Sequence, residues 1–284
     1  GAEPKKIVCT YDSLPKLLRT KGFNPKAFKL LVDEAHTLVN LGSFKAATCE
    51  FVLQNYTKFA SYVFLTATPT KREYFPEALI NVPLCTIQWE DVRNVKFNLQ
   101  NIEQGIGLNN ALFGLCYDYL MGKIEGNAHI FYNSVSEIAS VLNKLKEVVD
   151  KETGKNLFDP NDIRVVCSKS GTNQKTFNSR LGTKWASIAD ITDPVRKINL
   201  YTSTAFEGAD VLDEEGQTYI IINGVRDATK VDFHVLVPQI VGRIRNTKYN
   251  EHINLLVANL PEAASCTKDE WMSTVTKRIQ NSRD

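Results

Sequence analysis

The sequence predicts an α/β fold with parallel sheets, divided between two domains. Short runs rich in β-branched residues alternate along the chain with longer stretches of helical pattern, as in β-α units whose helices connect parallel strands. The 284 residues exceed one average domain, so two domains are expected. The expected strands span 6–10, 28–33, 62–66, 129–132, 163–167, 198–202, 218–223 and 253–257, and the expected helices span 13–20, 43–55, 109–121, 135–150, 172–181, 231–245 and 268–281.

The two domains are expected to differ in completeness. Polar residues interrupt the alternation between 90 and 103, and only three strands precede this interruption, which is few for a doubly wound sheet. The chain also begins with Gly1 almost directly before a strand. We therefore expect residues 1–92 to be the carboxyl-terminal part of a first lobe, 93–260 to be a whole second lobe, and 261–284 to be a helical tail anchored by Trp271.

Composition excludes some classes of protein and leaves others open. Apolar residues make up 43% of the chain, charged residues make up 23%, and the net charge is +2. This balance is typical of a globular protein and gives no global argument for nucleic-acid binding, although basic residues can still gather in one groove. No apolar run approaches the roughly 20 residues of a membrane span, and no secretory signal is visible. The six cysteines lack zinc-ligand spacing, so we expect buried, reduced thiols in a cytoplasmic protein.

Two adjacent carboxylates carry the strongest chemical signal. Asp33 and Glu34 follow the apolar run 28–32 and precede His36. The carboxyl ends of parallel strands face the ligand crevice of an α/β sheet, and two neighbouring acids repel unless a cation or proton offsets them. A Mg²⁺ held through water by Asp33, with Glu34 orienting or deprotonating an attacking water, meets this requirement and suits phosphoryl transfer. A solvated acidic turn is the alternative interpretation.

A second strand end carries small hydroxyl residues. The run 62–65 ends in Thr66-Ala67-Thr68-Pro69. Hydroxyl side chains at that position can bond to neighbouring carboxylates without filling a crevice. Taken alone, the segment is a strand-to-loop junction with proline as the breaker.

Together these segments resemble motifs II and III of superfamily 2 helicases of the DEAD/DEAH-box type, with motif II at 33–36 and motif III at 65–69. One short motif occurs by chance, whereas six in the family's order, covering nearly the whole chain, are specific. The other four resemblances are 7–14 to the Ia/Ib region, 129–134 to motif IV, 201–210 to motif V and 239–245 to motif VI.

The resemblance implies two RecA-like lobes of the P-loop NTPase type, the first of them incomplete. It further implies a fragment of an ATP-dependent helicase or translocase that moves along or unwinds DNA or RNA, with ATP and Mg²⁺ as cofactors. Asp33 would hold the metal, Glu34 would activate water, and His36 would lie at the nucleotide. Thr66 and Thr68 would couple the nucleotide site to movement.

Motifs V and VI imply the nucleotide contacts of the second lobe. Gly208 would let the backbone approach a ligand closely, and Asp210 would accept from a ribose hydroxyl or bond across the lobe interface. Gln239, Arg243 and Arg245 would face the nucleotide, one arginine acting as a finger worth about 10³–10⁵ in rate. The family pattern is Gly-Arg-x-x-Arg, but one residue separates Arg243 from Arg245 here, so either can be the finger. We expect both on an amphipathic helix; the alternative is a pair of surface arginines.

Nucleic-acid contacts are expected on the Ia/Ib, IV and V segments and at the helix start after strand 163–167, where side chains can meet phosphates. Ser134 with Glu137 also predicts a capping box for the helix 135–150. The expected contact residues are Thr10, Tyr11, Ser13, Ser134, Lys169, Ser170, Thr202 and Ser203.

One departure from the family concerns phosphate binding. A motor of this type needs a Gly-rich Walker A loop ending in Gly-Lys-Ser/Thr, and none is present in these 284 residues. We expect this chain alone to bind ATP poorly and to require a preceding Walker A segment. The motif VI spacing, with segments 10–14 and 203–208, resembles helicase-like origin-binding proteins of large DNA viruses and related phage helicases. A nucleic-acid-binding scaffold without ATPase activity, and a motor linked to restriction or primase domains, stay open as alternatives.

Overall fold

The computed structural model divides into two compact units, Gly1–Glu90 (unit 1) and Asp91–Asp284 (unit 2). Every pair of strands described in either unit is parallel, which confirms the predicted α/β class. The structure describes residues 6–38, 46–68, 72, 75–88, 94–102, 106–149, 154, 156, 159–182, 188–206, 210–231, 236–259, 267, 269–270 and 273.

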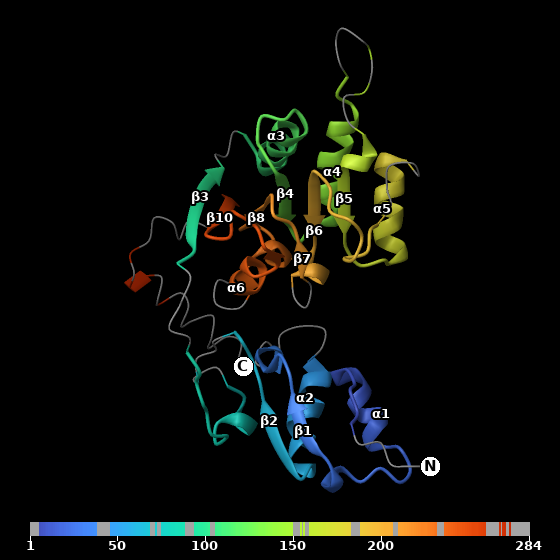
Figure 1. The fold of residues 1–284 in the computed structure, drawn as a ribbon, viewed down its shortest axis with the longest axis vertical. Helices are drawn as coiled ribbons and strands as arrows, with labels where there is room; N and C mark the ends of the chain where they lie inside the picture. Colours follow the sequence, from blue (N-terminus) through green and yellow to red (C-terminus); the bar gives the residue numbers. More distant parts are fainter. Residues whose placement is uncertain are drawn as a thin grey trace. The chain divides into compact units, whose positions relative to one another are not determined.

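A six-stranded parallel sheet forms the centre of unit 2, in the order β3-β10-β8-β4-β6-β5 (Figure 1). In register, Ile130 of β4 lies beside Leu200 of β6 and Tyr219 of β8. The inner strands are nearly continuous apolar runs, as expected for strands buried on both faces. The strands are β3 (Lys96–Ile102), β4 (Asn127–Phe131), β5 (Ile163–Val166), β6 (Ile198–Tyr201), β8 (Gly216–Asn223) and β10 (His252–Ala258).

Two apolar clusters cover the two faces of this sheet. On one face, α3 (Leu108–Leu120), α4 (Val135–Lys146) and α5 (Gly171–Leu181) pack against alternate strand residues such as Ile130 and Leu256. On the other face, α6 (Leu236–Val241) and the short parallel pair of β7 (Val211–Leu212) and β9 (Ile244–Arg245) pack against the intervening residues, such as Phe131 and Leu255. The period of two along each strand thus assigns successive side chains to different layers.

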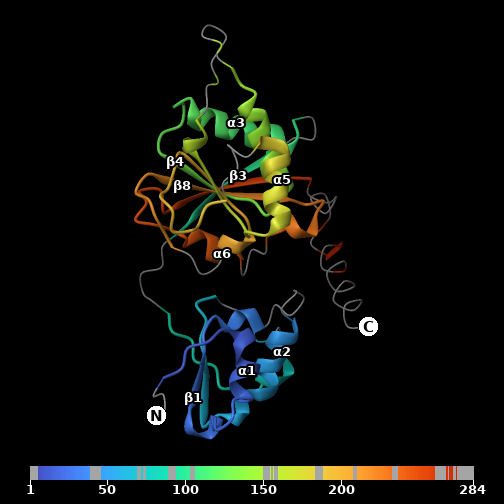
Figure 2. The same ribbon diagram turned by 90° about the vertical axis from the view of Figure 1, so that its right-hand side faces the viewer.

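Unit 1 contains a two-stranded parallel sheet covered on one face. Helices α1 (Leu14–Leu18) and α2 (Ala46–Asn55) lie on the same side of the strands β1 (Lys29–Val32) and β2 (Ser61–Phe64), as Figure 2 shows. The opposite face leaves Leu31, Val63 and Leu65 exposed by 61%, 52% and 45%. Parallel sheets are ordinarily buried on both faces. The described part of unit 1 therefore lacks one covering layer.

Short 3₁₀ turns connect the elements of both units. They are η1 (Tyr11–Ser13), η2 (Pro25–Ala27), η3 (Ala35–Leu38), η4 (Tyr56–Lys58), η6 (Glu77–Leu79), η7 (Pro160–Asp162), η8 (Ser203–Ala205) and η9 (Asp227–Thr229).

The sequence-based strand assignment missed the short strands β7 and β9 and was wrong in two longer segments. Residues 6–10 do not form a strand, because no strand in the described part of the chain pairs with them, and Val8 is 85% exposed. Strand β3 lies instead within the polar segment 90–103, which was expected to be a boundary. It is an edge strand whose residues are mostly exposed, and its apolar alternation is short, with only Phe97 and Leu99 standing between polar residues of the strand. Most of the predicted helix 268–281 lies outside the described residues.

The cysteines only partly match the expected burial. Cys49, Cys116 and Cys167 are buried, whereas Cys9 and Cys85 are exposed, and all five are free thiols. Burial raises the pKa of Cys116 to about 12, which keeps its thiol protonated at neutral pH. Within the part of the chain that the structure describes, no helix is both long and apolar enough to cross a membrane.

Truncation of a central strand residue should destabilise unit 2 strongly. Ile130 is fully buried between β6 and β8, and Ile130→Ala should lower the free energy of unfolding by about 2–5 kcal/mol. Urea denaturation followed by circular dichroism measures this change. Val225→Ala is the matched control, because Val225 is 72% exposed and surface substitutions usually change stability by less than about 0.5 kcal/mol. Equal effects of the two variants would contradict the placement of β4 at the centre of the sheet.

Candidate functional site

Two segments of unit 1 lie side by side beyond the ends of β1 and β2. The Leu65 N–H donates to the Val32 carbonyl oxygen at 2.8 Å, and the Ala35 N–H donates to the Leu65 carbonyl oxygen at 2.8 Å. These bonds continue the parallel pairing past the last strand residues. The carboxylate segment 33–36 and the hydroxyl segment 66–68 therefore meet at the carboxyl ends of adjacent strands.

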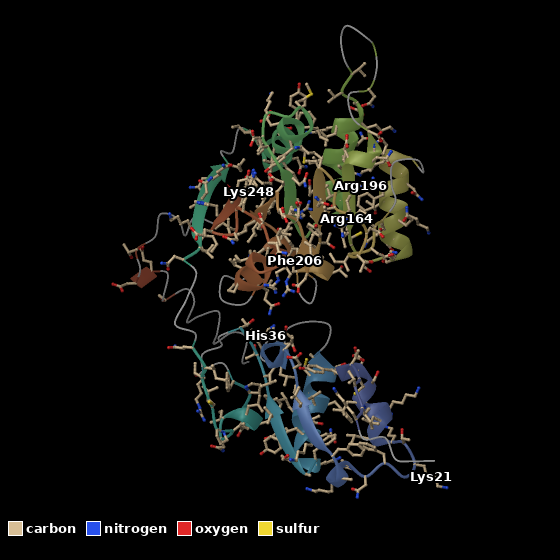
Figure 3. All side chains as sticks on the ribbon, viewed as in Figure 1. Lys21, His36, Arg164, Arg196, Phe206 and Lys248 are labelled. Atoms are coloured by element: carbon tan, nitrogen blue, oxygen red, sulfur yellow. The ribbon has the colours of Figure 1, made fainter. Side chains whose placement is uncertain are left out.

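His36, labelled in Figure 3, connects these two segments through one ring nitrogen. Its side chain is buried, and Nδ1 lies 3.0 Å from Thr66 Oγ1 and 3.3 Å from Glu34 Oε2. The Thr66 hydroxyl donates to the Thr68 carbonyl oxygen at 3.3 Å and accepts the Thr68 N–H at 3.0 Å. Since the hydroxyl donates elsewhere and a carboxylate only accepts, this pattern assigns the proton of a neutral His36 to Nδ1.

Backbone contacts hold Asp33 and Glu34. Glu34 has a φ of 51°, a left-handed conformation that costs about 1–3 kcal/mol and is common at functional sites. Its N–H donates to Asp33 Oδ1 at 2.9 Å, and its carboxylate reaches His36 two residues along the chain. The Tyr11 hydroxyl donates to the Asp33 carbonyl oxygen. Burial raises the pKa of Tyr11, so this hydroxyl stays protonated as the donor.

Asp33 is suited to binding a cation whose other ligands are waters and substrate phosphates. The Asp33 side chain is exposed, and its Oδ1 already accepts the Glu34 N–H. No three His, Cys, Asp or Glu side chains form a metal-binding group among the residues that the structure describes. Mg²⁺ commonly keeps several waters and takes one or two carboxylates together with substrate phosphates. Asp33 matches that donor set, and it would hold a free cation only weakly.

In unit 2, the predicted residues of motifs V and VI come together. Arg243 donates from Nε to the Gln239 carbonyl oxygen at 2.9 Å and from Nη2 to Gln239 Oε1 at 3.2 Å. Asp210 Oδ1 accepts from Arg245 Nε at 3.0 Å and lies 4.0 Å from Arg243 Nη1. The Arg243 side chain is 13% exposed and the Arg245 side chain is 52% exposed. The fifth expected residue, Gly208, lies outside the described residues.

The prediction that Arg243 and Arg245 share a helix was wrong. Helix α6 ends at Val241, Arg243 follows in a turn, and Arg245 is in β9. The Arg243 N–H donates to the Ile240 carbonyl oxygen at 3.0 Å, a three-residue step that closes the last helical turn. Ile244 then pairs with Val211 and is buried. The helix ends at Val241 because Ile244 is buried in the strand pair β7–β9, which requires an extended backbone. Gly242, which directly follows Val241, is a weak helix former.

The loops after β4, β6 and β8 meet at one edge of the unit 2 sheet. The Asn133 side chain joins all three, because its Nδ2 donates to the Ala228 carbonyl oxygen at 2.7 Å and its Oδ1 accepts the Ser203 N–H at 3.1 Å. Ser203 is exposed at this edge, whereas Thr202 is buried. Asn133 was not among the site residues predicted from the sequence, although an amide directly after an apolar strand is a signal for such a link.

Ser134 forms one half of the predicted capping box. Its hydroxyl accepts the Glu137 N–H at 3.4 Å, and Ser134 is buried at the start of α4. In a complete capping box the Glu137 carboxylate would accept the Ser134 N–H. Here that carboxylate instead contacts Asn109 and lies 3.2 Å from Arg226 Nη1. The Ser134 hydroxyl therefore acts first as a helix cap.

The remaining expected contact residues are in two places. In unit 2, Lys169 Nζ lies 2.6 Å from Asp190 Oδ2, and Ser170 caps α5 by accepting the Asn173 N–H at 3.2 Å. In unit 1, the hydroxyls of Thr10 and Ser13 lie 3.0 Å apart on either side of Tyr11.

A buried network of polar side chains, which was not predicted from the sequence, runs across the neighbouring strands β4 and β6 of unit 2. His129 Nδ1 lies 2.9 Å from the Tyr201 hydroxyl, and His129 Nε2 lies 2.8 Å from Asp213 Oδ2. Asp213 also accepts from Asn127 Nδ2 at 2.9 Å and from the Glu215 N–H at 3.0 Å. A histidine inside an apolar strand was the available signal.

This network of polar side chains extends to β9 at one end and to β5 at the other. The Asp213 N–H donates to the Arg245 carbonyl oxygen at 3.2 Å, so the polar network is attached to β9. At its other end, the buried Arg164 guanidinium lies 5.8 Å from the centre of the Tyr201 ring (Figure 3). Burial lowers the pKa of His129, against the effect of Asp213. Burial alone would raise the pKa of Asp213, but its hydrogen bonds, first that from His129, hold it below the ordinary 3.8.

Comparison with known proteins gives similarity in structure but not in sequence. The sequence matches no family model, and no curated protein matches it. Among solved structures, a variant of S. cerevisiae Dbp5 bound to Nup159, a Gle1 variant, IP6 and ADP is similar at a TM-score of 0.38 and 13% sequence identity. The match covers 95% of this chain and 62% of that chain. A similarity at this level establishes no family membership for the chain.

The buried histidine should make stability depend on pH. The folded state disfavours the proton on His129, so the unfolded chain binds more protons as pH falls below the ordinary value of 6.5. The free energy of unfolding should therefore fall on acidification, by at most about 1.4 kcal/mol per pH unit for one proton. Asp213 adds a further loss as pH falls through 3.8.

Urea denaturation at pH 8, 7, 6 and 5 measures this dependence. The slope between pH 7 and 5 should be smaller in His129→Gln and unchanged in His252→Gln, because His252 is exposed. A slope that is the same in all three proteins would contradict the burial of a neutral His129.

Proposed function

We propose that this chain is part of an ATP-dependent nucleic-acid helicase or translocase of superfamily 2, in which units 1 and 2 are two RecA-like lobes. One observation carries the proposal: in each unit, motifs far apart in sequence contact each other as a shared site requires. In unit 1, His36 contacts Thr66 at 3.0 Å. In unit 2, Arg245 contacts Asp210 at 3.0 Å.

Unit 1 supplies the groups for hydrolysis in this proposal. When bound, ATP supplies the phosphoryl group, and Mg²⁺ supplies the positive charge that offsets the negative charge of the phosphates. The exposed Asp33 carboxylate would hold the metal through water. The Glu34 carboxylate, half exposed and held by His36 at 3.3 Å, orients the attacking water and accepts its proton.

Unit 2 supplies the arginine that responds to the phosphate, and we assign this role to Arg245. Arg243 is largely buried and makes two bonds to Gln239, so it positions the turn. Arg245 is half exposed, and only its Nε contacts Asp210. Its two terminal nitrogens are thus suited to the planar, two-pronged binding of phosphate oxygens.

The nucleic-acid strand, DNA or RNA, is proposed to contact unit 2 at the loop edge tied by Asn133. Ser203, Lys169 and Ser170 follow the carboxyl ends of the neighbouring strands β6 and β5, and hydroxyl and ammonium groups are common phosphate contacts. In unit 1 the hydroxyls of Thr10 and Ser13 offer the same chemistry. These contacts carry no base specificity.

A Walker A segment is the further part that this function requires. We propose that it adds strands and a covering layer to the exposed face of the unit 1 sheet, at Leu31 and Val63. Its Gly-rich loop would bind the β- and γ-phosphates.

Removal of the Glu34 carboxylate should abolish hydrolysis in a version of the protein that carries the Walker A segment. ATPase activity, measured with and without single-stranded nucleic acid, should fall about 10²–10⁴-fold in Glu34→Gln, because the amide cannot accept a proton. Glu50→Gln is the matched control, because Glu50 lies on the exposed face of α2, where it accepts from Gln54 at 2.9 Å. No hydrolysis by the folded wild type would favour a nucleic-acid-binding scaffold instead.

Alanine substitutions of Arg245 and Arg243 should affect different properties, the first catalysis and the second stability. Arg245→Ala should lower kcat of the same longer protein by about 10³-fold or more, with little change in stability because the side chain is half exposed. Arg243→Ala should instead lower the free energy of unfolding, since it leaves the buried Gln239 amide without that partner. The opposite assignment of the two effects, read from steady-state kinetics and urea denaturation, would identify Arg243 as the finger.

A further inference from the structure

An apolar strip lies uncovered on the edge strand of the unit 2 sheet. Phe97 and Leu99 of β3 are 48% and 57% exposed. In register they lie beside Ile253 and Leu255 of β10, which are 1% and 4% exposed. The strip therefore continues the apolar face that α6 covers farther along the sheet. The layer on that face ends one strand short of the sheet edge.

The chain leaves the sheet beside this strip. Ala258, the last residue of β10, pairs with Ile102 at the end of β3. Asn259 follows with a φ of 50°, the left-handed conformation in which an asparagine turns a chain. Its Nδ2 donates to Asn223 Oδ1 at 3.2 Å, which fixes the turn to the sheet. All residues after 259 thus start from the edge at which the strip lies.

A helix start follows within reach. The Thr267 N–H donates to Glu270 Oε2 at 2.7 Å, and the Glu270 N–H donates to Thr267 Oγ1 at 3.4 Å. This reciprocal pair is a capping box, which marks the first turn of a helix. Downstream, Trp271, Val275 and Ile279 recur every four residues, as the apolar stripe of an amphipathic helix does.

We propose that the carboxyl-terminal segment 268–281 of this same chain docks as a helix on the strip of Phe97 and Leu99. Fourteen helical residues are about 21 Å long, and the seven residues of β3 span about 23 Å. The eight residues 259–266 reach about 26–29 Å when extended, enough to place the helix anywhere along β3. Trp271 then contacts the strip and completes the layer.

The size of the strip favours a tethered occupant over a second copy of the chain. Stable interfaces between separate molecules bury roughly 1,200–2,000 Å², and two half-exposed side chains supply little of that area. A tethered segment needs far less contact, because a short linker holds it at an effective concentration in the millimolar range.

Alkylation of a thiol placed in the strip tests the docking. In Leu99→Cys, peptide-resolved mass spectrometry follows the labelling rate by iodoacetamide in the full chain and in the chain shortened after residue 266. The exposed thiols of Cys9 and Cys85 serve as internal references in both proteins. Docking predicts that shortening raises the labelling rate at position 99 about tenfold or more, as for the release of a locally folded element, with unchanged reference rates.

A second substitution separates docking from a general effect of shortening. Trp271→Ala in the full chain should reproduce the faster labelling, whereas Ile87→Ala should not, because Ile87 is 79% exposed in unit 1. Equal labelling of position 99 in full and shortened chains overturns the proposal. Protection that grows with protein concentration also overturns it, because a second copy is then the occupant.

Discussion

The requirement that a parallel sheet be covered on both faces governs most of this structure. In unit 2 the inner strands carry apolar side chains to both faces, and each face has its own layer, with Ile130 in one cluster and Phe131 in the other. Where the covering layer ends, apolar residues are left exposed, at Leu99 on the edge of unit 2 and at Leu31 in unit 1. The proposed tail helix and the proposed Walker A segment both meet this one requirement at different sheets.

The same parallel arrangement explains why the candidate site residues come together. All carboxyl ends of neighbouring strands lie at one edge, so loops that are distant in sequence become neighbours there. Asn133 then ties the loops after β4, β6 and β8 with two side-chain bonds, and His36 ties the two loops of unit 1. Both ties use a side chain with donor and acceptor capacity to connect loops that the sheet only brings close.

A buried network of polar side chains interrupts the apolar core of unit 2. His129 and Asp213 would be costly to bury singly, but each finds its partners in the other and in Tyr201 and Asn127. Asp213 also accepts from and donates to the backbone near β9. Hydrogen bonds thus link the strand that carries Arg245, through Asp213, to a histidine in the central strand β4.

The sequence by itself determined the elements with strong apolar patterns: seven of the eight expected strands, the parallel α/β class, and the placement of Asp33, Glu34 and Thr66 after strand ends. Local pattern sufficed there, because burial on both faces requires continuous apolar runs. Only the tertiary structure decided that residues 6–10 lack a strand partner, that the polar segment 96–102 is an edge strand, and that Arg245 leaves the helix for β9. Each of these depends on a neighbour distant in sequence, since strand pairing and the burial of Ile244 are long-range contacts that no local pattern encodes.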